Sequence, residues 1–161
     1  MLIYIDTANL EEINKASDLG ILDGVTTNPS LIAKEGIERN KQIEKIAKIV
    51  KGPVSAEVVS TESKKMIEEG VDLSKIGTNV VVKLPSTVDG LQACKALSDL
   101  NIKTNLTLCF QPLQALMVAK AGAFLVSPFL GRIDDIGGDG VSLIEQIRSI
   151  YDQYGFNTLL L

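Results

Sequence analysis

The stretch Val80-Val81-Val82-Lys83-Leu84-Pro85 decides the fold class of this chain. Three consecutive β-branched valines predict a strand that is buried on both faces, as in a parallel sheet covered by helices on both sides. Lys83 lies at the carboxyl end of this strand. It either reaches water along its flexible stem, as an ordinary surface lysine, or loses its charge to apolar surroundings and becomes a nucleophile.

Strand and helix patterns alternate on either side of this stretch. Short apolar runs that end in polar residues predict strands, and apolar residues at helical spacing follow most of them until a glycine or proline ends the helix. Asn9 and Glu12 are expected to open the first helix as a capping box, and the last helix is expected to span roughly Val141 to Tyr154. The predicted strands are 2–5, 25–28, 54–58, 80–84, 103–108, 124–127 and 158–161.

These strand–helix units, without a linker between them, predict one α/β domain over residues 1–161 with parallel strands. A doubly wound open sheet would usually carry a glycine-rich loop after its first strand, and Asp6-Thr7-Ala8-Asn9 contains no glycine. A (β/α)8 TIM barrel instead gathers polar residues from many strand ends at one face, and we expect this fold. The residues at six successive strand ends are Asp6, Asn28, Glu57, Lys83, Thr107 and Ser127.

The length of the chain is the difficulty for this fold. A barrel of eight units usually needs roughly 200 to 250 residues, and the sequence has 161. We therefore expect the barrel to be truncated within strand 7, with its C-terminal units missing from the sequence. The sequence would then be part of a longer chain, a chain that completes its barrel through another subunit, or a degraded copy.

Composition excludes several classes of function. A net charge of −4 without runs of like charge argues against a nucleic-acid groove or an anionic membrane surface as partner. The sequence contains no histidine and its two cysteines, Cys94 and Cys109, lack metal-ligand spacing, so we expect neither a metal site nor a disulfide. Without an apolar run of membrane-spanning length or a signal peptide, we expect a cytoplasmic protein.

A lysine amine among carboxylates, amides and hydroxyls suits Schiff-base chemistry. The uncharged amine attacks a ketone, and the resulting iminium accepts electrons while a neighbouring carbon–carbon bond breaks. Glu57 and Thr107 are placed to hold a water that carries protons while the carbinolamine forms and dehydrates. Asp6 is placed to take the proton from the substrate hydroxyl, and Arg132 to pair with a substrate phosphate.

Each of these residues also has an alternative interpretation that needs no chemistry. Asp6 is typical of a helix cap or turn, and Asn28 before a proline is typical of turn chemistry. Thr107 favours a strand on propensity alone. Arg132, in a predicted loop that carries two aspartates, is compatible with a surface ion pair, and Phe129 with simple packing.

The motifs at these strand ends, taken together and in order from Met1 to about Phe156, resemble the small transaldolase family. The resemblance implies a cofactor-independent enzyme of the pentose phosphate pathway that moves a dihydroxyacetone unit from sedoheptulose 7-phosphate to glyceraldehyde 3-phosphate. The motifs are Ile5-Asp6-Thr7-Ala8-Asn9, Gly24-Val25-Thr26-Thr27-Asn28-Pro29-Ser30, Ser55-Ala56-Glu57-Val58, Val82-Lys83-Leu84-Pro85, Thr104-Asn105-Leu106-Thr107-Leu108 and Ser127-Pro128-Phe129-Leu130-Gly131-Arg132.

The resemblance also implies roles for individual residues. Lys83 would form the Schiff base, Asp6 would be the general acid and base, and Glu57 with Thr107 would bind the catalytic water. The substrate-binding residues would be Thr26, Asn28, Asn105, Ser127, Phe129 and Arg132, the last of them for the phosphate.

Two other functions remain open at this point. A fructose-6-phosphate aldolase, which is a lyase, is expected to carry glutamine in place of Glu57 and tyrosine in place of Phe129, so both residues favour transaldolase. A catalytically inactive barrel fragment is the other alternative. Members of the family tend to form rings of subunits, and we therefore expect a homo-oligomer that binds sugar phosphates.

Overall fold

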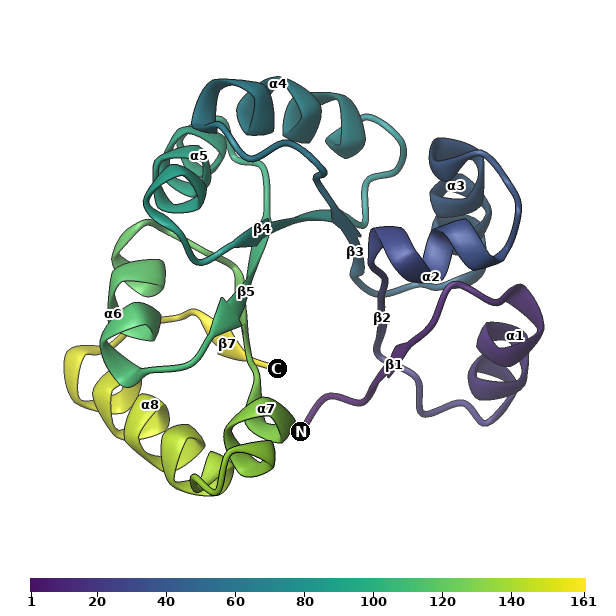
Figure 1. Ribbon diagram of the computed structural model, residues 1–161. Coiled ribbons are helices and arrows are strands. Elements are labelled where there is room, and N and C mark those ends of the chain that lie inside the picture. Colours follow the sequence, from purple (N-terminus) through teal and green to yellow (C-terminus); the bar gives the residue numbers. More distant parts are fainter. The chain divides into compact units, whose positions relative to one another are not determined.

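The computed structural model describes all 161 residues, and strands alternate with helices along the chain (Figure 1). The strands follow one another in chain order in one sheet, and the neighbouring pairs β1–β2, β2–β3, β5–β6 and β6–β7 are parallel. Parallel strands in sequential order with helical connections are the pattern of a (β/α)8 barrel, so the predicted fold class is confirmed. The elements are β1 (Tyr4–Asp6), α1 (Leu10–Asp18), β2 (Gly24–Thr26), α2 (Pro29–Lys34), α3 (Arg39–Ile49), β3 (Val54–Glu57), α4 (Ser63–Ser74), β4 (Val80–Pro85), α5 (Val88–Asp99), β5 (Thr104–Cys109), α6 (Pro112–Lys120), β6 (Leu125–Pro128), α7 (Leu130–Asp135), α8 (Gly140–Tyr154) and β7 (Leu159–Leu160).

The chain forms two compact units. The first comprises Met1–Val59 and Glu68–Val82, and the second comprises Ser60–Ile67 and Lys83–Leu161. The boundary falls within β4, between Val82 and Lys83. That the whole chain is one barrel domain with missing C-terminal units stays a prediction.

The first unit contains the parallel strands β1, β2 and β3. Asp6 pairs with Thr26, and Thr26 pairs with Ser55, so these three residues lie in one row across the sheet. Helix α3 packs against both α1 and α2 (Figure 1). Fully buried isoleucines from α1 and α3, such as Ile13 and Ile46, supply its core.

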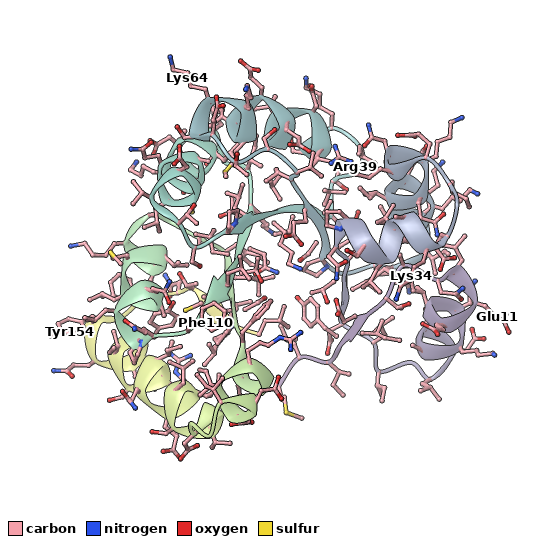
Figure 2. All side chains as sticks on the ribbon, viewed as in Figure 1. Glu11, Lys34, Arg39, Lys64, Phe110 and Tyr154 are labelled. Atoms are coloured by element: carbon pink, nitrogen blue, oxygen red, sulfur yellow. The ribbon has the colours of Figure 1, made fainter.

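The second unit contains β5, β6 and β7, with α6 and α7 packed against α8 (Figure 1). The hydroxyl of Tyr151, a fully buried residue of α8, donates to the carbonyl of Ala115 on α6 at 2.8 Å. At the end of α8, Tyr154 projects outward and is 65% exposed (Figure 2). Gly155 then ends the helix in the left-handed conformation, with φ of 68°, as its glycine predicts.

The local structure differs from the sequence analysis at three places. A short helix, α2, follows β2 directly, because Asn28 caps it and Pro29 occupies its first turn, where a missing N–H is harmless. A second short helix, α7, occupies the predicted loop after β6. The capping box of α1 is half as predicted. Asn9 caps the helix, with its Oδ1 accepting from the N–H of Glu12 at 3.1 Å. The Glu12 carboxylate, however, accepts from the Thr7 hydroxyl at 2.5 Å, and it is that hydroxyl oxygen that accepts from the Asn9 N–H, at 3.1 Å.

Candidate active site

Lys83 is the only charged residue among the buried side chains, with 8% of its surface exposed. Every residue of β4 from Val80 to Leu84 is buried, as the valine run predicts. An ordinary surface lysine would keep its ammonium group in water. The burial of Lys83 therefore favours the interpretation in which this amine has a chemical role.

The next strand places two polar residues on the face from which Lys83 projects. The N–H of Ser86 donates to the carbonyl of Thr107 at 2.8 Å. In a parallel ladder a carbonyl accepts from the residue that follows its partner, so Thr107 pairs with Pro85 and Asn105 pairs with Lys83. Because paired residues of neighbouring strands share a face, Lys83, Asn105 and Thr107 lie on the same side of the sheet.

The alternate residues of β5, Thr104 and Leu106, face the helices instead. Thr104 Oγ1 lies 3.3 Å from Cys94 Sγ on α5, in a fully buried contact. Burial raises the pKa of the Cys94 thiol, although the Thr104 hydrogen bond lowers it in part. Burial likewise raises the pKa of the other thiol, Cys109. Both cysteines are free, and their raised pKa values make them poor nucleophiles.

Thr107 presents a buried hydroxyl for which the protein provides no hydrogen-bond partner. Most buried polar atoms are paired, so such a group needs an explanation. A role in binding water or substrate beside Lys83 is one explanation, and it matches the position that the sequence predicts for Thr107. Strand propensity alone does not account for the unpaired hydroxyl.

Asn105, near the start of β5, and Ser127, near the end of β6, are joined by a hydrogen bond. The Ser127 hydroxyl donates to Asn105 Oδ1 at 2.9 Å, and Asn105 is fully buried. The bond orients the Asn105 amide, so that its NH2 group points away from Ser127. These two of the predicted substrate-binding residues therefore form one hydrogen-bonded polar group.

Phe129 and Arg132 lie beyond β6, in and just before α7. The Phe129 ring contacts Phe110 edge to face, with ring centroids 5.6 Å apart (Figure 2 labels Phe110). Arg132 belongs to α7 and not to a loop, and its partner is Asp135, with Nη1 and Oδ2 3.2 Å apart. Both of these side chains are largely exposed, so the pair resembles the surface ion pair of the alternative interpretation. An open hollow of about 460 Å³ is lined by residues 128–132 and Asp135.

In the first unit, Asp6 and Thr26 meet at the ends of β1 and β2. The Thr26 hydroxyl donates to Asp6 Oδ1 at 2.6 Å, and Asp6 is exposed. Thr26 also lies beside Ser55 in the register of β2 and β3, and Glu57 follows on the same face of β3, half-buried. In this unit, β1, β2 and β3 thus each place polar residues on one face of the sheet.

Asn28 has a structural role, whereas its role in substrate binding stays a prediction. Its Oδ1 accepts from the N–H of Leu31 at 2.9 Å and so caps α2. The amide oxygen is therefore engaged, and its NH2 group is the part that remains suited to a ligand. The alternative interpretation, local turn chemistry, describes the oxygen correctly.

Behind Asp6 on β1 lies Tyr4, which the sequence analysis did not single out. A side chain at Gly24 would come within 2.2 Å of the Tyr4 ring, so only glycine fits beside it. Burial, with a smaller contribution from Asp23, raises the pKa of the Tyr4 hydroxyl. Tyr4 is therefore neutral at pH 7 and lies two residues before Asp6 on the same face of β1. The spacing of two residues along the strand was the signal that could have identified it.

The loop between β1 and α1 is held by a residue that is distant in sequence. Gln42 of α3 is fully buried, and its Nε2 donates to the Ala8 carbonyl at 2.7 Å. No local sequence signal indicates this bond, because it joins residues that are 34 positions apart. It fixes the loop that directly follows Asp6.

No group of three or more His, Cys, Asp or Glu side chains is arranged to hold a metal ion. None of the helices combines the length and the apolar character that crossing a bilayer requires.

Comparisons with known proteins give a consistent result. Residues 3–161 match the profile of the family described as Transaldolase/Fructose-6-phosphate aldolase. A protein of Bacillus cereus named "Probable transaldolase 1" is 58% identical over 158 residues, which cover 98% of this chain and 74% of that protein. Proteins named "Probable transaldolase" from Leptospira biflexa and Bartonella bacilliformis are 55% and 54% identical over the whole chain, which covers 75% and 74% of their lengths.

The match includes the motifs at all six strand ends, because it extends over nearly the whole sequence. The resemblance seen in those motifs is therefore confirmed, and the names of the relatives support a transferase. The chain belongs to the transaldolase/fructose-6-phosphate aldolase family.

Proposed function

We propose that this protein is a transaldolase that works through a Schiff base on Lys83. It would transfer a dihydroxyacetone unit from a ketose phosphate, such as sedoheptulose 7-phosphate or fructose 6-phosphate, to an aldose phosphate. The single observation that carries the mechanism is the burial of Lys83, the one charged residue in the interior. The names of the relatives support the same activity.

The reaction begins when the uncharged Lys83 amine attacks the ketone carbon of the donor. The carbinolamine loses water and becomes an iminium ion, and this ion accepts the electron pair of the adjacent carbon–carbon bond as the bond breaks. The aldose phosphate leaves, and the three-carbon enamine stays on the lysine. It then attacks the aldehyde of the acceptor, and water releases the new ketose.

Proton transfers in this scheme are assigned to Asp6, Glu57 and Thr107. Asp6 takes the proton of the donor hydroxyl as the bond breaks, and the Thr26 hydroxyl at 2.6 Å holds its carboxylate in one orientation. Glu57 and Thr107 bind the water that serves carbinolamine formation and dehydration. The unpaired, buried Thr107 hydroxyl supports this role.

The remaining residues are assigned to substrate binding. Asn28, Asn105 and Ser127 supply amide and hydroxyl groups for the dihydroxyacetone hydroxyls, and Thr26 contributes beside Asp6. Phe129 forms an apolar wall. Arg132 leaves Asp135 to bind the phosphate, an exchange of partners that an exposed ion pair permits at little cost.

Borohydride trapping tests the proposal. Incubation with fructose 6-phosphate followed by reduction should add one reduced dihydroxyacetone unit to the chain, and peptide mass spectrometry should locate it on Lys83. Lys83→Ala should abolish the adduct, while Lys95→Ala, which removes an exposed lysine of α5, should leave it unchanged. An adduct that persists in the Lys83→Ala variant would refute the assignment, and no adduct in the wild type would favour an inactive fragment.

An aldolase-type lyase is the second candidate, because the family includes fructose-6-phosphate aldolases. The two activities differ in the fate of the three-carbon unit. A lyase releases free dihydroxyacetone without an acceptor, whereas a transaldolase holds it until an aldose phosphate arrives. Measuring free dihydroxyacetone with fructose 6-phosphate alone, and then with an added aldose phosphate acceptor, distinguishes them. Glu57 and Phe129 lead us to expect the transferase.

Three further features belong to the same proposal. Two free, buried cysteines are typical of a reducing compartment and support a cytoplasmic location. The pentose phosphate pathway is the setting that the substrates imply. A homo-oligomer is expected from the family resemblance, and light scattering of the purified protein tests it.

A further inference from the structure

The backbone of β5 departs from a regular strand at Leu108. Leu106 pairs with Val126 and Cys109 pairs with Pro128, so two residues of β5, Thr107 and Leu108, stand opposite the single residue Ser127 of β6. This arrangement is a β-bulge. At its centre Leu108 has a φ of 59°, in the left-handed region.

A leucine is poorly suited to this conformation. Left-handed backbone brings Cβ close to the following carbonyl oxygen, and glycine or asparagine normally occupies such positions. Core packing does not explain the choice, because the Leu108 side chain is 40% exposed. The bulge is therefore held in place by its surroundings and not by the preference of Leu108.

Two backbone hydrogen bonds hold the bulge on either side. The Thr107 carbonyl accepts from the N–H of Ser86 at 2.8 Å, and the Cys109 carbonyl accepts from the N–H of Phe129 at 2.9 Å. These bonds fix the residues before and after Leu108 to β4 and to the end of β6. Between these two bonds, the left-handed conformation of Leu108 allows β5 to accommodate one residue more than β6.

The bulge determines how the Thr107 hydroxyl is presented. In a regular strand, Thr107 would stand directly opposite Ser127, and the two hydroxyls would be neighbours. With the bulge, Ser127 bonds to Asn105 and the Thr107 hydroxyl stays buried and unpaired on the face of Lys83. We propose that the left-handed backbone of Leu108 is a positioning device that orients the Thr107 hydroxyl for Schiff-base formation. This inference rests on the function proposed above.

The proposal makes a prediction that reverses the usual order of conservative substitution. Leu108→Gly and Leu108→Asn both remove the apolar side chain but accept positive φ, so both should keep the bulge. Leu108→Val keeps an apolar side chain but is β-branched, and positive φ is strongly unfavourable for it. If the side chain itself mattered, valine would be the better replacement.

The chain offers a matched control in Asn101, the other non-glycine residue with positive φ, also at 59°. It lies in the turn between α5 and β5, within the same unit. Asn101→Val should therefore lower the melting temperature as Leu108→Val does, without affecting Thr107. Comparing the two valine variants separates backbone strain from loss of the positioned hydroxyl.

The assay is the rate of borohydride trapping with saturating fructose 6-phosphate. Leu108→Gly and Leu108→Asn should trap within about threefold of the wild-type rate, whereas Leu108→Val should be slower by about a hundredfold, the usual effect of a displacement near 1 Å. Asn101→Val should trap at the wild-type rate. In a Thr107→Ala background, Leu108→Val should cause little further loss, because the group that it displaces is already absent.

Each outcome decides the matter. A wild-type rate in Leu108→Val, or a large loss in Leu108→Gly and Leu108→Asn, would overturn the positioning role while leaving Lys83 chemistry intact. Full additivity with Thr107→Ala would also overturn it. Absence of any adduct in the wild type would instead remove the proposed function and this inference with it. Where Leu108→Val does not fold, the glycine and asparagine variants remain the test, because a large loss of trapping in either would overturn the positioning role.

Discussion

Asn79, just before β4, is the residue whose replacement should reveal most about how the fold holds the strand of Lys83. Its Nδ2 donates to three carbonyls, those of Val50 at 2.7 Å, Gly52 at 3.0 Å and Ala47 at 3.2 Å. Its own carbonyl accepts from the N–H of Val54 at 2.9 Å. The side-chain amide of Asn79 thus links the end of α3 and the turn after it to the start of β4.

The expected loss in the free energy of unfolding follows from the number of hydrogen-bond donors that Asn79 provides. An NH2 group has two hydrogens, so three carbonyls share two donors, and Asn79→Ala removes about two net hydrogen bonds of roughly 0.5–1.5 kcal/mol each. Carbonyls left buried without a partner add to the loss, and we expect about 2–4 kcal/mol in total. Asn79→Asp should cost more at pH 7, because a carboxylate would then face three carbonyl oxygens.

Urea unfolding followed by far-ultraviolet circular dichroism measures these free energies. Asn40→Ala, at an exposed position in the first turn of α3, is the control and should change stability by no more than about 0.5 kcal/mol. The gap between Asn79→Asp and Asn79→Ala should narrow near pH 4, since a protonated carboxyl regains one donor. A loss below about 1 kcal/mol for Asn79→Ala would refute the reasoning, because no net role for the three bonds would remain.

Two further predictions concern packing and pH. Burial raises the pKa of the Tyr151 hydroxyl. The stability that the neutral hydroxyl provides is therefore complete below about pH 10, where the unfolded chain begins to lose this proton, and it is lost as pH rises further. The free energy of unfolding, measured from about pH 9 to 11, should fall more steeply for the wild type than for Tyr151→Phe. At pH 7 Tyr151→Phe should itself cost about 1 kcal/mol, because the bond to Ala115 is lost. Gly52→Ala would bring Cβ within 1.7 Å of the Asp23 carbonyl oxygen and should lower the melting temperature sharply, whereas Gly131→Ala, which meets no atom within 4 Å, should not. Equal melting temperatures for the two alanine variants would contradict this packing argument.

The fold class could be predicted because its signals are repeated and local. Strand and helix patterns alternate along the chain, and the apolar run in β4 is buried at every position from Val80 to Leu84. The two short helices were missed for different reasons. The signals for α2 were present in Asn28 and Pro29, but they also suit a turn. Helix α7 has no side-chain cap and contains Gly131, so its formation depends on packing against α8.

The candidate site was predictable to the extent that it depends on strand ends. A polar residue after an apolar run is visible in a sequence, and Asp6, Lys83 and Thr107 were chosen as candidates in this way. The pairing of those residues depends on register, which the sequence does not specify. The conformation of Leu108 is harder still, since leucine is among the residues that avoid positive φ, and only the surrounding backbone bonds impose it.

The position of Lys83 along the chain accounts for how a buried amine is held in place. The backbone of β4 is anchored before the lysine, where the Asn79 carbonyl accepts from Val54, and after it, where the Ser86 N–H donates to Thr107. A flexible lysine loses considerable rotamer freedom on burial. Anchoring its strand at both ends confines that flexibility to the side chain, so that the Lys83 amine and the Thr107 hydroxyl project from fixed backbone positions. A loop would not provide this, and we infer that this is why the amine lies on an interior strand.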